Sequence, residues 1–231
     1  MSNEIISEWD NAASEYMSAQ EQSNYVAVNK KIVSDRFKDL RNKTVLDLGC
    51  GYGWYANYFS SIGSIVTGCD GSSEMIALAR KNYPDIAFEI VDIQQVFPYA
   101  DRSFDLVFCN QVLMDIENLD IVIKEAHRVL KQDGIFYFAI VHPAFYSGEW
   151  VRDENGFGKS KIMSRYLSNY SFQNEFWGKT THFHRPISSY LNSVIKQGFV
   201  LTDIQEPVTY DGISKSKELP LFLFAEFVKK I

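Results

Sequence analysis

Several features that define other classes of protein are scarce or missing in the 231-residue sequence. The three cysteines are too few for a disulfide framework and lack CxxC spacing, so we expect free thiols and no metal. No run of Lys or Arg occurs and the net charge is −6, which argues against nucleic-acid and membrane partners. No apolar run reaches the length of a membrane span, and the acidic start MSNEIISEWD does not resemble a signal peptide. We therefore expect a cytoplasmic protein.

The sequence instead shows short apolar runs that alternate with helical patterns. Its composition, 46% hydrophobic and 23% charged, is that of a globular protein. Strands are predicted at 44–48, 64–69, 87–91, 104–109 and 135–141, and helices at 54–62, 74–82 and 119–130. Such alternation is typical of an α/β fold with a parallel sheet covered by helices on both faces.

The flanking segments complete this plan. One or two amphipathic helices are predicted over 5–40, a helix over 187–197, and two final strands over 199–205 and 221–229. The stretch 144–186 is rich in Tyr, Phe, Gly, Ser and Asn with weak periodicity, which suggests a lid or binding insertion. We expect a single domain with a doubly wound, mostly parallel, seven-stranded sheet. Its parts are a helical cap (1–42), a core (43–143), the insertion (144–186) and a C-terminal helix with strands (187–231).

Unusual residues follow the predicted strands, where open α/β sheets bind ligands. Gly49, Gly51 and Gly53 follow the first strand, and Asp70 follows the second, 21 residues after Gly49. An acid at that distance can accept hydrogen bonds from both hydroxyls of a ribose. The dinucleotide fingerprint needs its third glycine one place later, where this chain has Trp54. The glycine turn therefore argues against NAD.

Four segments, in matching order and spacing, resemble the motifs of class I S-adenosylmethionine (SAM)-dependent methyltransferases. They are Val45-Leu46-Asp47-Leu48-Gly49-Cys50-Gly51-x-Gly53, Gly68-Cys69-Asp70-x-Ser72-x-x-Met75, Phe88-x-x-x-Asp92 with Ser103-Phe104-Asp105-Leu106-Val107, and Arg128-Val129-Leu130-Lys131-x-x-Gly134. The resemblance covers residues 43–143 and implies a Rossmann-like methyltransferase fold with SAM as cofactor and S-adenosylhomocysteine as product. The implied cofactor-binding residues are Gly49, Cys50, Gly51, Asp70, Gly71, Met75, Asp92, Ile93, Asn110 and Gln111.

The resemblance also implies roles. Gly49 and Gly51 would approach the amino-acid part of SAM, Asp70 would bind the ribose, Asp92 with Ile93 would meet the adenine, and Asn110 with Gln111 would lie beside the sulfonium. Asp47 is interpreted as a structural carboxylate. Relatives often carry His where Asp115 stands, so no role is transferred to that position.

For the methyl acceptor, we expect a small molecule with an O, N or C nucleophile, bound by a monomer or homodimer. The insertion is predicted to supply most of the acceptor pocket, and His142, which ends the fifth strand, is a candidate general base or a structural histidine. A metal site from His182 and His184 is not expected. Two other functions stay open: a non-catalytic SAM-binding or regulatory protein, and a NAD-dependent oxidoreductase. The candidate acceptor-binding residues are Tyr16, Phe145, Tyr146, Trp150, Phe176, Trp177 and His184.

Overall fold

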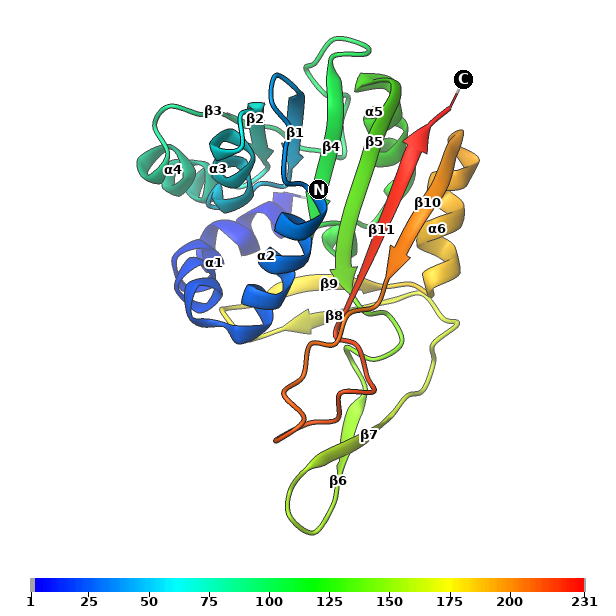
Figure 1. Cartoon of the computed structure of the whole chain (residues 1–231). Coiled ribbons are helices and arrows are strands. Elements are labelled where there is room, and N and C mark those ends of the chain that lie inside the picture. Colours follow the sequence, from blue (N-terminus) through cyan, green and yellow to red (C-terminus); the bar gives the residue numbers. More distant parts are fainter. Residues whose placement is uncertain (1–2, 231) are drawn as a thin grey trace.

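The computed structural model describes residues 3–230, and within them a seven-stranded sheet forms the centre of the molecule (Figure 1). The strands lie in the order β10-β11-β5-β4-β1-β2-β3. All neighbouring pairs are parallel except the two that β11 forms with β5 and β10. The expected mostly parallel, doubly wound sheet is confirmed. The strands are β1 (Thr44–Leu48), β2 (Ile65–Asp70), β3 (Ala87–Ile90), β4 (Phe104–Asn110), β5 (Leu130–Val141), β10 (Phe199–Gln205) and β11 (Phe222–Lys229).

Two hydrophobic clusters pack the helices onto opposite faces of this sheet. Successive side chains of a strand point to opposite faces. Leu106 and Phe108 of β4 therefore join one cluster, while Val107 and Cys109 join the other. The first cluster is covered by α2 (Asn24–Arg36), α3 (Trp54–Ser61) and α4 (Ser73–Asn82), and the second by α5 (Leu119–Val129) and α6 (Ile187–Lys196).

Local signals fix most of these boundaries. Ser72 caps α4, because its Oγ accepts a hydrogen bond from the backbone N–H of Met75 at 3.1 Å. Gly63, with a φ of 92°, lies in the turn that follows α3. One boundary differs from expectation: β5 begins at Leu130, and the predicted turn at 132–134 is an irregularity within it, where Asp133 has a φ of 58°.

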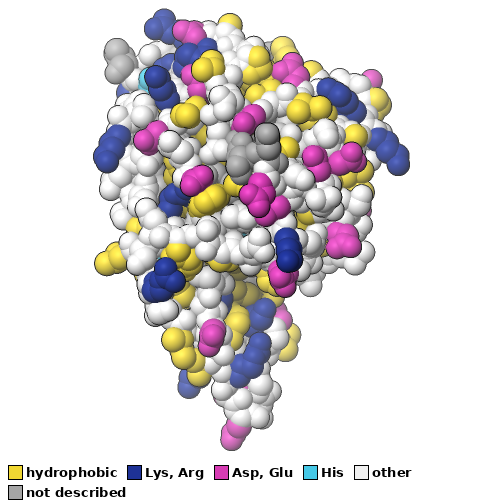
Figure 2. All heavy atoms as spheres, turned by 180° about the vertical axis from the view of Figure 1, so that it is seen from behind, with side chains coloured by type: hydrophobic (Ala, Val, Ile, Leu, Met, Phe, Trp, Pro, Cys, Tyr) yellow, Lys and Arg dark blue, Asp and Glu magenta, His cyan; other side chains and the backbone are white. Residues whose placement is uncertain are grey.

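The insertion is more regular than its sequence suggested, since it forms two antiparallel hairpins. β6 (Glu149–Arg152) pairs with β7 (Gly158–Ile162), and β8 (Tyr170–Asn174) pairs with β9 (Thr180–His184). The β6–β7 hairpin projects away from the sheet beside the β10–β11 connection (Figure 1) and forms the narrow end of the molecule in Figure 2.

The N-terminal helix α1 (Asn3–Gln22) joins the insertion to the sheet. Glu8 accepts hydrogen bonds from the backbone N–H and the Oγ1 of Thr181 in β9, at 2.8 and 3.0 Å. Two residues further along the helix, Asp10 accepts from Ser72 Oγ at 2.7 Å and from the backbone N–H of Glu74 at 3.2 Å. This helix therefore contacts both the start of α4 and the β8–β9 hairpin.

Between residues 3 and 230, no helix is both long and apolar enough to cross a membrane.

Candidate functional site

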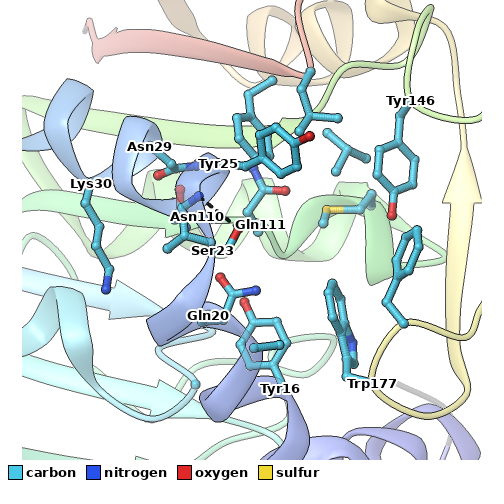
Figure 3. A pocket seen from close by; sticks show the side chains of 18 of the residues that line it. Tyr16, Gln20, Ser23, Tyr25, Asn29, Lys30, Asn110, Gln111, Tyr146 and Trp177 are labelled. Carbon is cyan, nitrogen blue, oxygen red and sulfur yellow. Dashed lines mark hydrogen bonds between the residues drawn. The ribbon is translucent and has the colours of Figure 1, made fainter. Parts of the chain in front are cut away.

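A cavity of about 600 Å³ opens at the carboxyl ends of β1, β4 and β5. Its floor is the glycine turn after β1 and the segment after β4. In Figure 3, Tyr16 and Gln20 of α1 and Tyr25 and Asn29 of α2 face this floor, with Tyr146 and Trp177 of the insertion on another side. The cavity is thus built by segments that are far apart in the sequence.

The glycine turn needs glycine for two different reasons. All three glycines have positive φ: 72° at Gly49, 51° at Gly51 and 86° at Gly53. A Cβ at Gly49 would lie 2.3 Å from Val112 Cγ2, so this glycine lets the post-β4 segment approach. A Cβ at Gly51 would meet only Met75 Sδ at 3.9 Å, and Gly51 lines the cavity. Its backbone N–H donates to Asp70 at 3.0 Å.

Three buried polar atoms near this turn have no hydrogen-bond partner within the described chain. They belong to Asp47 (Oδ2), Asn110 (Oδ1) and Gln111 (Nε2), and all three residues line the cavity. Burial raises the pKa of Asp47 to about 8, against a smaller opposing effect of the Ala56 backbone. A buried polar group without a partner is costly, so these atoms favour a polar ligand. With this pKa, Asp47 is protonated near neutral pH in the free protein, and a cation bound beside it would favour the ionised carboxylate. Such a role goes beyond the structural one expected from the sequence.

Five of the ten predicted cofactor residues do not line the cavity: Asp70, Gly71, Met75, Asp92 and Ile93. The side chains of Met75 and Ile93 are 2% and 0% exposed, as parts of the core. Helix α1 lies over this end of the sheet. Its residue Ile6 is so close to Gly71 that a Cβ at Gly71 would lie 3.3 Å from Ile6 Cγ1. The carboxylate of Asp70 accepts from the backbone N–H groups of Gly51 and Ser72, at 3.0 and 2.9 Å.

Aromatic side chains form the wall opposite the glycine turn. Tyr16 packs edge-to-face against Trp9, Tyr52 and Trp177, with ring centroids 5.3, 6.4 and 5.0 Å apart, and so connects three segments of the chain. The predicted residues Tyr16, Tyr146, Trp150, Phe176 and Trp177 all line the cavity. The insertion does not supply most of the wall, however, since α1, α2 and their connection contribute at least as many lining residues.

Three of the residues predicted to act on the acceptor, His142, Phe145 and His184, do not line the main cavity, which argues against the roles expected for them. Both ring nitrogens of His142 are occupied: Nδ1 accepts from the Ala144 backbone at 3.1 Å, and Nε2 donates to Glu206 at 2.6 Å. The Phe145 ring stacks on this buried imidazole, with centroids 4.7 Å apart. Neither residue lines the cavity, so His142 is a structural histidine here. His184 donates to the Tyr166 carbonyl at 2.9 Å and lines a small neighbouring cavity.

A buried histidine–aspartate pair, which the sequence did not reveal, is an alternative to His142 as the candidate general base. His182 lines the main cavity, and its Nε2 lies 3.4 Å from Asp115 Oδ1. Within the described residues, neither His182 nitrogen has a hydrogen-bond partner. Burial lowers the pKa of His182 to about 4 and raises that of Asp115 well above its usual range, with Asp70 and Glu8 adding to the Asp115 shift. No signal in the sequence indicated this pair, because the buried positions of β9 carry Thr180, His182 and His184, whereas the apolar Phe183 is only half-buried.

Known proteins share both the sequence and the fold of the core. Residues 46–138 match the family described as methyltransferase domain. A malonyl-[acyl-carrier protein] O-methyltransferase of Hamiltonella defensa is 33% identical over 101 residues, 44% of this chain and 39% of that protein. A demethylmenaquinone methyltransferase of Chlorobaculum parvum is 40% identical over 104 residues, 45% of this chain and 42% of that protein. The chain therefore spans about two fifths of the length of these relatives.

The fold similarity extends over most of the chain. The crystal structure of an S-adenosylmethionine dependent methyltransferase of Mesorhizobium loti superposes with a TM-score of 0.74. The match covers 91% of this chain and 100% of that chain at 23% identity, which is evidence for the fold alone. The sequence match therefore identifies residues 46–138 as a methyltransferase domain, and the chain as a whole has the fold of a SAM-dependent methyltransferase.

Proposed function

We propose that this chain transfers a methyl group from SAM to an O, N or C nucleophile of a small molecule. One observation carries the proposal: a single cavity joins the glycine turn of the methyltransferase domain to an aromatic chamber. A transferase needs this continuity, because donor and acceptor must meet away from water. Relatives named for methyl transfer to different acceptors support the reaction class but point to no common acceptor.

The residues around the glycine turn fit the amino-acid part of SAM. The unpartnered carboxylate of Asp47 suits an ammonium group, and Asn110 and Gln111 offer further polar atoms. Aromatic faces such as Tyr16 and Trp177 suit a cationic sulfonium, since a ring face attracts positive charge. The backbone N–H groups of Gly51, Ser72 and Gly71 use three of the roughly four acceptor positions of Asp70, which leaves about one for a ribose hydroxyl.

When bound, SAM would supply an electrophilic methyl group: a lone pair of the acceptor would attack it in line with the breaking carbon–sulfur bond, and S-adenosylhomocysteine would leave. The chain then has to hold the acceptor in position, and orientation alone is worth a large part of such a barrier. The aromatic wall excludes water from the chamber. An acceptor that arrives protonated must also lose its proton.

His182 is the residue that we assign to that proton. Burial keeps the imidazole neutral, so a ring nitrogen has a free lone pair, but the lowered pKa makes it a weak base by itself. A negative charge on Asp115 beside it would raise that basicity. Asp115 lies beside it and positions the ring, as carboxylates do for catalytic histidines. His182 would then be the catalytic residue, and Asp115 a positioning residue.

Calorimetry with SAM, S-adenosylhomocysteine and NAD tests the proposal. We expect S-adenosylhomocysteine to bind and to raise the unfolding midpoint, because a ligand of the native state stabilises it. Incubation with methyl-labelled SAM and small-molecule extracts, followed by mass spectrometry, should then reveal a labelled product. Binding of NAD without binding of SAM would overturn the proposal in favour of an oxidoreductase. Binding of SAM with no labelled product in any extract would favour a non-catalytic SAM-binding protein.

A further inference from the structure

Two lysines line the cavity where the insertion meets the β10–β11 connection. Lys161 lies on β7, and Lys215 lies between β10 and β11. A bridge between Gly158 and Lys215 brings these segments together, with the Gly158 N–H donating to Ser214 O at 3.0 Å and the Ser216 N–H to Gly158 O at 2.8 Å. Both lysines are therefore held by backbone pairing at one end of the cavity.

Three aromatic rings surround the two ammonium groups. Tyr210 packs edge-to-face on Tyr25 and on Trp150, with centroids 5.6 and 5.1 Å apart. Lys215 Nζ lies 5.2 Å from the Tyr210 ring centre and 5.5 Å from that of Tyr25, and Lys161 Nζ lies 4.9 Å from that of Trp150. Tyr25, Trp150 and Tyr210 line the cavity as well, so positive charge and flat apolar surface occur together.

The positive charge of these lysines is not neutralised within the described chain. No carboxylate between residues 3 and 230 forms an ion pair with Lys161 or Lys215. Lys161 donates to the carbonyls of Phe145 and Tyr146, which leaves one of its three N–H groups, and Lys215 donates to the Tyr25 hydroxyl at 3.2 Å. Burial, with Lys215 nearby, lowers the pKa of Lys161 to about 8. Two unpaired cations in one cavity are unfavourable, and an anion would relieve that cost.

The glycine turn has a cation of its own. Lys30 of α2 lines the cavity with its Nζ 4.1 Å from the Trp54 ring centre, next to Gly53. Lys161 and Lys215, in contrast, lie against Trp150, Tyr210 and Tyr25, none of which belongs to the glycine turn. The two lysines thus belong to the acceptor part of the cavity.

We propose that the methyl acceptor is a ring-bearing small molecule with an anionic group, a carboxylate or a phosphate, and that Lys161 and Lys215 bind this group. The proposal rests on the proposed function and deepens it. The ring of the acceptor lies against Tyr25, Trp150 and Tyr210, while the anion accepts hydrogen bonds from the two ammonium groups. Charge-assisted hydrogen bonds of this kind give both affinity and orientation.

A matched pair of fluorescent probes tests the site without knowledge of the acceptor. 8-Anilinonaphthalene-1-sulfonate and N-phenyl-1-naphthylamine share one ring system, and the first alone carries an anion. We expect the wild-type protein, saturated with S-adenosylhomocysteine, to bind the sulfonate at least 10-fold more tightly. Lys161→Met and Lys215→Met should each remove most of that preference, while Lys159→Met, an exposed lysine on the same strand, should keep it.

The controls separate this proposal from the proposed function. Lys215→Met spares the carbonyl contacts of Lys161, so a folding defect of Lys161→Met alone does not decide the outcome. Displacement of the sulfonate probe by benzoate or by phenyl phosphate distinguishes a carboxylate from a phosphate. Equal binding of both probes to the wild type would overturn the anion site, whatever the cofactor result. So would a 10-fold loss of S-adenosylhomocysteine affinity in Lys161→Met and Lys215→Met, which would assign the lysines to the cofactor. Failure of S-adenosylhomocysteine to bind the wild type would instead overturn the proposed function.

Discussion

Asp115 lies 3.4 Å from His182, which lines the cavity, and the two side chains are 4% and 3% exposed. They come from the segment after β4 and from β9, which are joined by no shared element. Burial disfavours the charged form of each group, so it raises the pKa of the carboxyl and lowers that of the imidazole. An uncharged imidazole beside a carboxyl is therefore the resting arrangement of the cavity.

The first prediction concerns the titration of His182. Its imidazole should titrate near pH 4, identified in NMR spectra by the signal that is lost in His182→Gln. Unfolded imidazole takes up a proton below about pH 6.5, whereas the folded one resists it until about pH 4. The His182 contribution to stability is thus lost as the pH falls through this window. His182→Gln should therefore gain stability relative to the wild type between pH 6.5 and 4. An ordinary titration near pH 6.5 would contradict the buried pair.

The second prediction concerns Asp47. The pKa of Asp47 in the folded protein, about 8, lies above its pKa in the unfolded chain. Between about pH 4 and 8, the folded protein therefore keeps a proton that the unfolded chain has already released. This contribution is present below pH 4 and is lost as the pH rises to 8. Asp47→Asn stays neutral throughout, so its unfolding midpoint should gain at least about 2–4 °C on the wild type between pH 5 and 8.

The same variant should bind S-adenosylhomocysteine about 10-fold more weakly, because the ammonium loses a charged hydrogen-bond partner. Calorimetry at pH 8 measures this, with Asp85→Asn as a comparison, since Asp85 is exposed and does not line the cavity. Identical pH profiles of wild type and Asp47→Asn would show that Asp47 is ionised at neutral pH in the free protein.

The third prediction separates the two glycines of the turn. Gly49→Ala places a Cβ 2.3 Å from Val112 Cγ2 at positive φ, so it should lower the free energy of unfolding by about 2–4 kcal/mol. Gly51→Ala meets no backbone or side chain closer than 3.9 Å and should cost about 1–2 kcal/mol through its φ alone. Its main effect should be on S-adenosylhomocysteine affinity, because Gly51 lines the cavity. Denaturant unfolding and calorimetry on both variants decide this, and normal binding by Gly51→Ala would remove the turn from the cofactor site.

The fourth prediction concerns helix α1. Ile6 lies against Gly71, so an adenosine bound at Asp70 must displace this helix. Hydrogen exchange of residues 3–22 should therefore change when S-adenosylhomocysteine is added. Asp10→Ala removes the contacts with Ser72 and Glu74 and should speed association of the ligand in stopped-flow measurements. Unchanged exchange in α1 on ligand binding would place the adenosine away from Asp70.

The strands and caps of the core were predictable because their signals are local. Thr44–Leu48 is a mostly apolar run, interrupted only by Asp47 after Thr44, as is typical of a buried parallel strand, and Ser72 stands where α4 needs a cap. The turn after β1 could likewise be predicted from its glycines alone, because glycine readily adopts positive φ. Local patterns of this kind depend on few distant contacts, which explains why they could be read from the sequence.

The cavity wall was harder to predict because it is made by long-range contacts. Tyr16 meets Trp177, and Asp115 meets His182, only when α1 and the β8–β9 hairpin pack over the sheet. His142 stands at a strand end, as the candidate base should, yet its partner Glu206 follows β10 and holds the ring away from the cavity. The position of a residue along a strand predicts where its backbone lies. The direction of its side chain can depend on a partner that is distant in the sequence, as it does for His142.

The construction of the cavity has a consequence for substitutions. The segment shared with other methyltransferases, 46–138, carries the glycine turn and is constrained by pairing on both sides of β1 and β4. Much of the wall comes instead from α1, α2, the two hairpins and the β10–β11 connection, where substitutions leave the sheet register intact. Under the proposed function, substitutions in these flanking segments would alter the acceptor pocket without disturbing the turn that holds the donor.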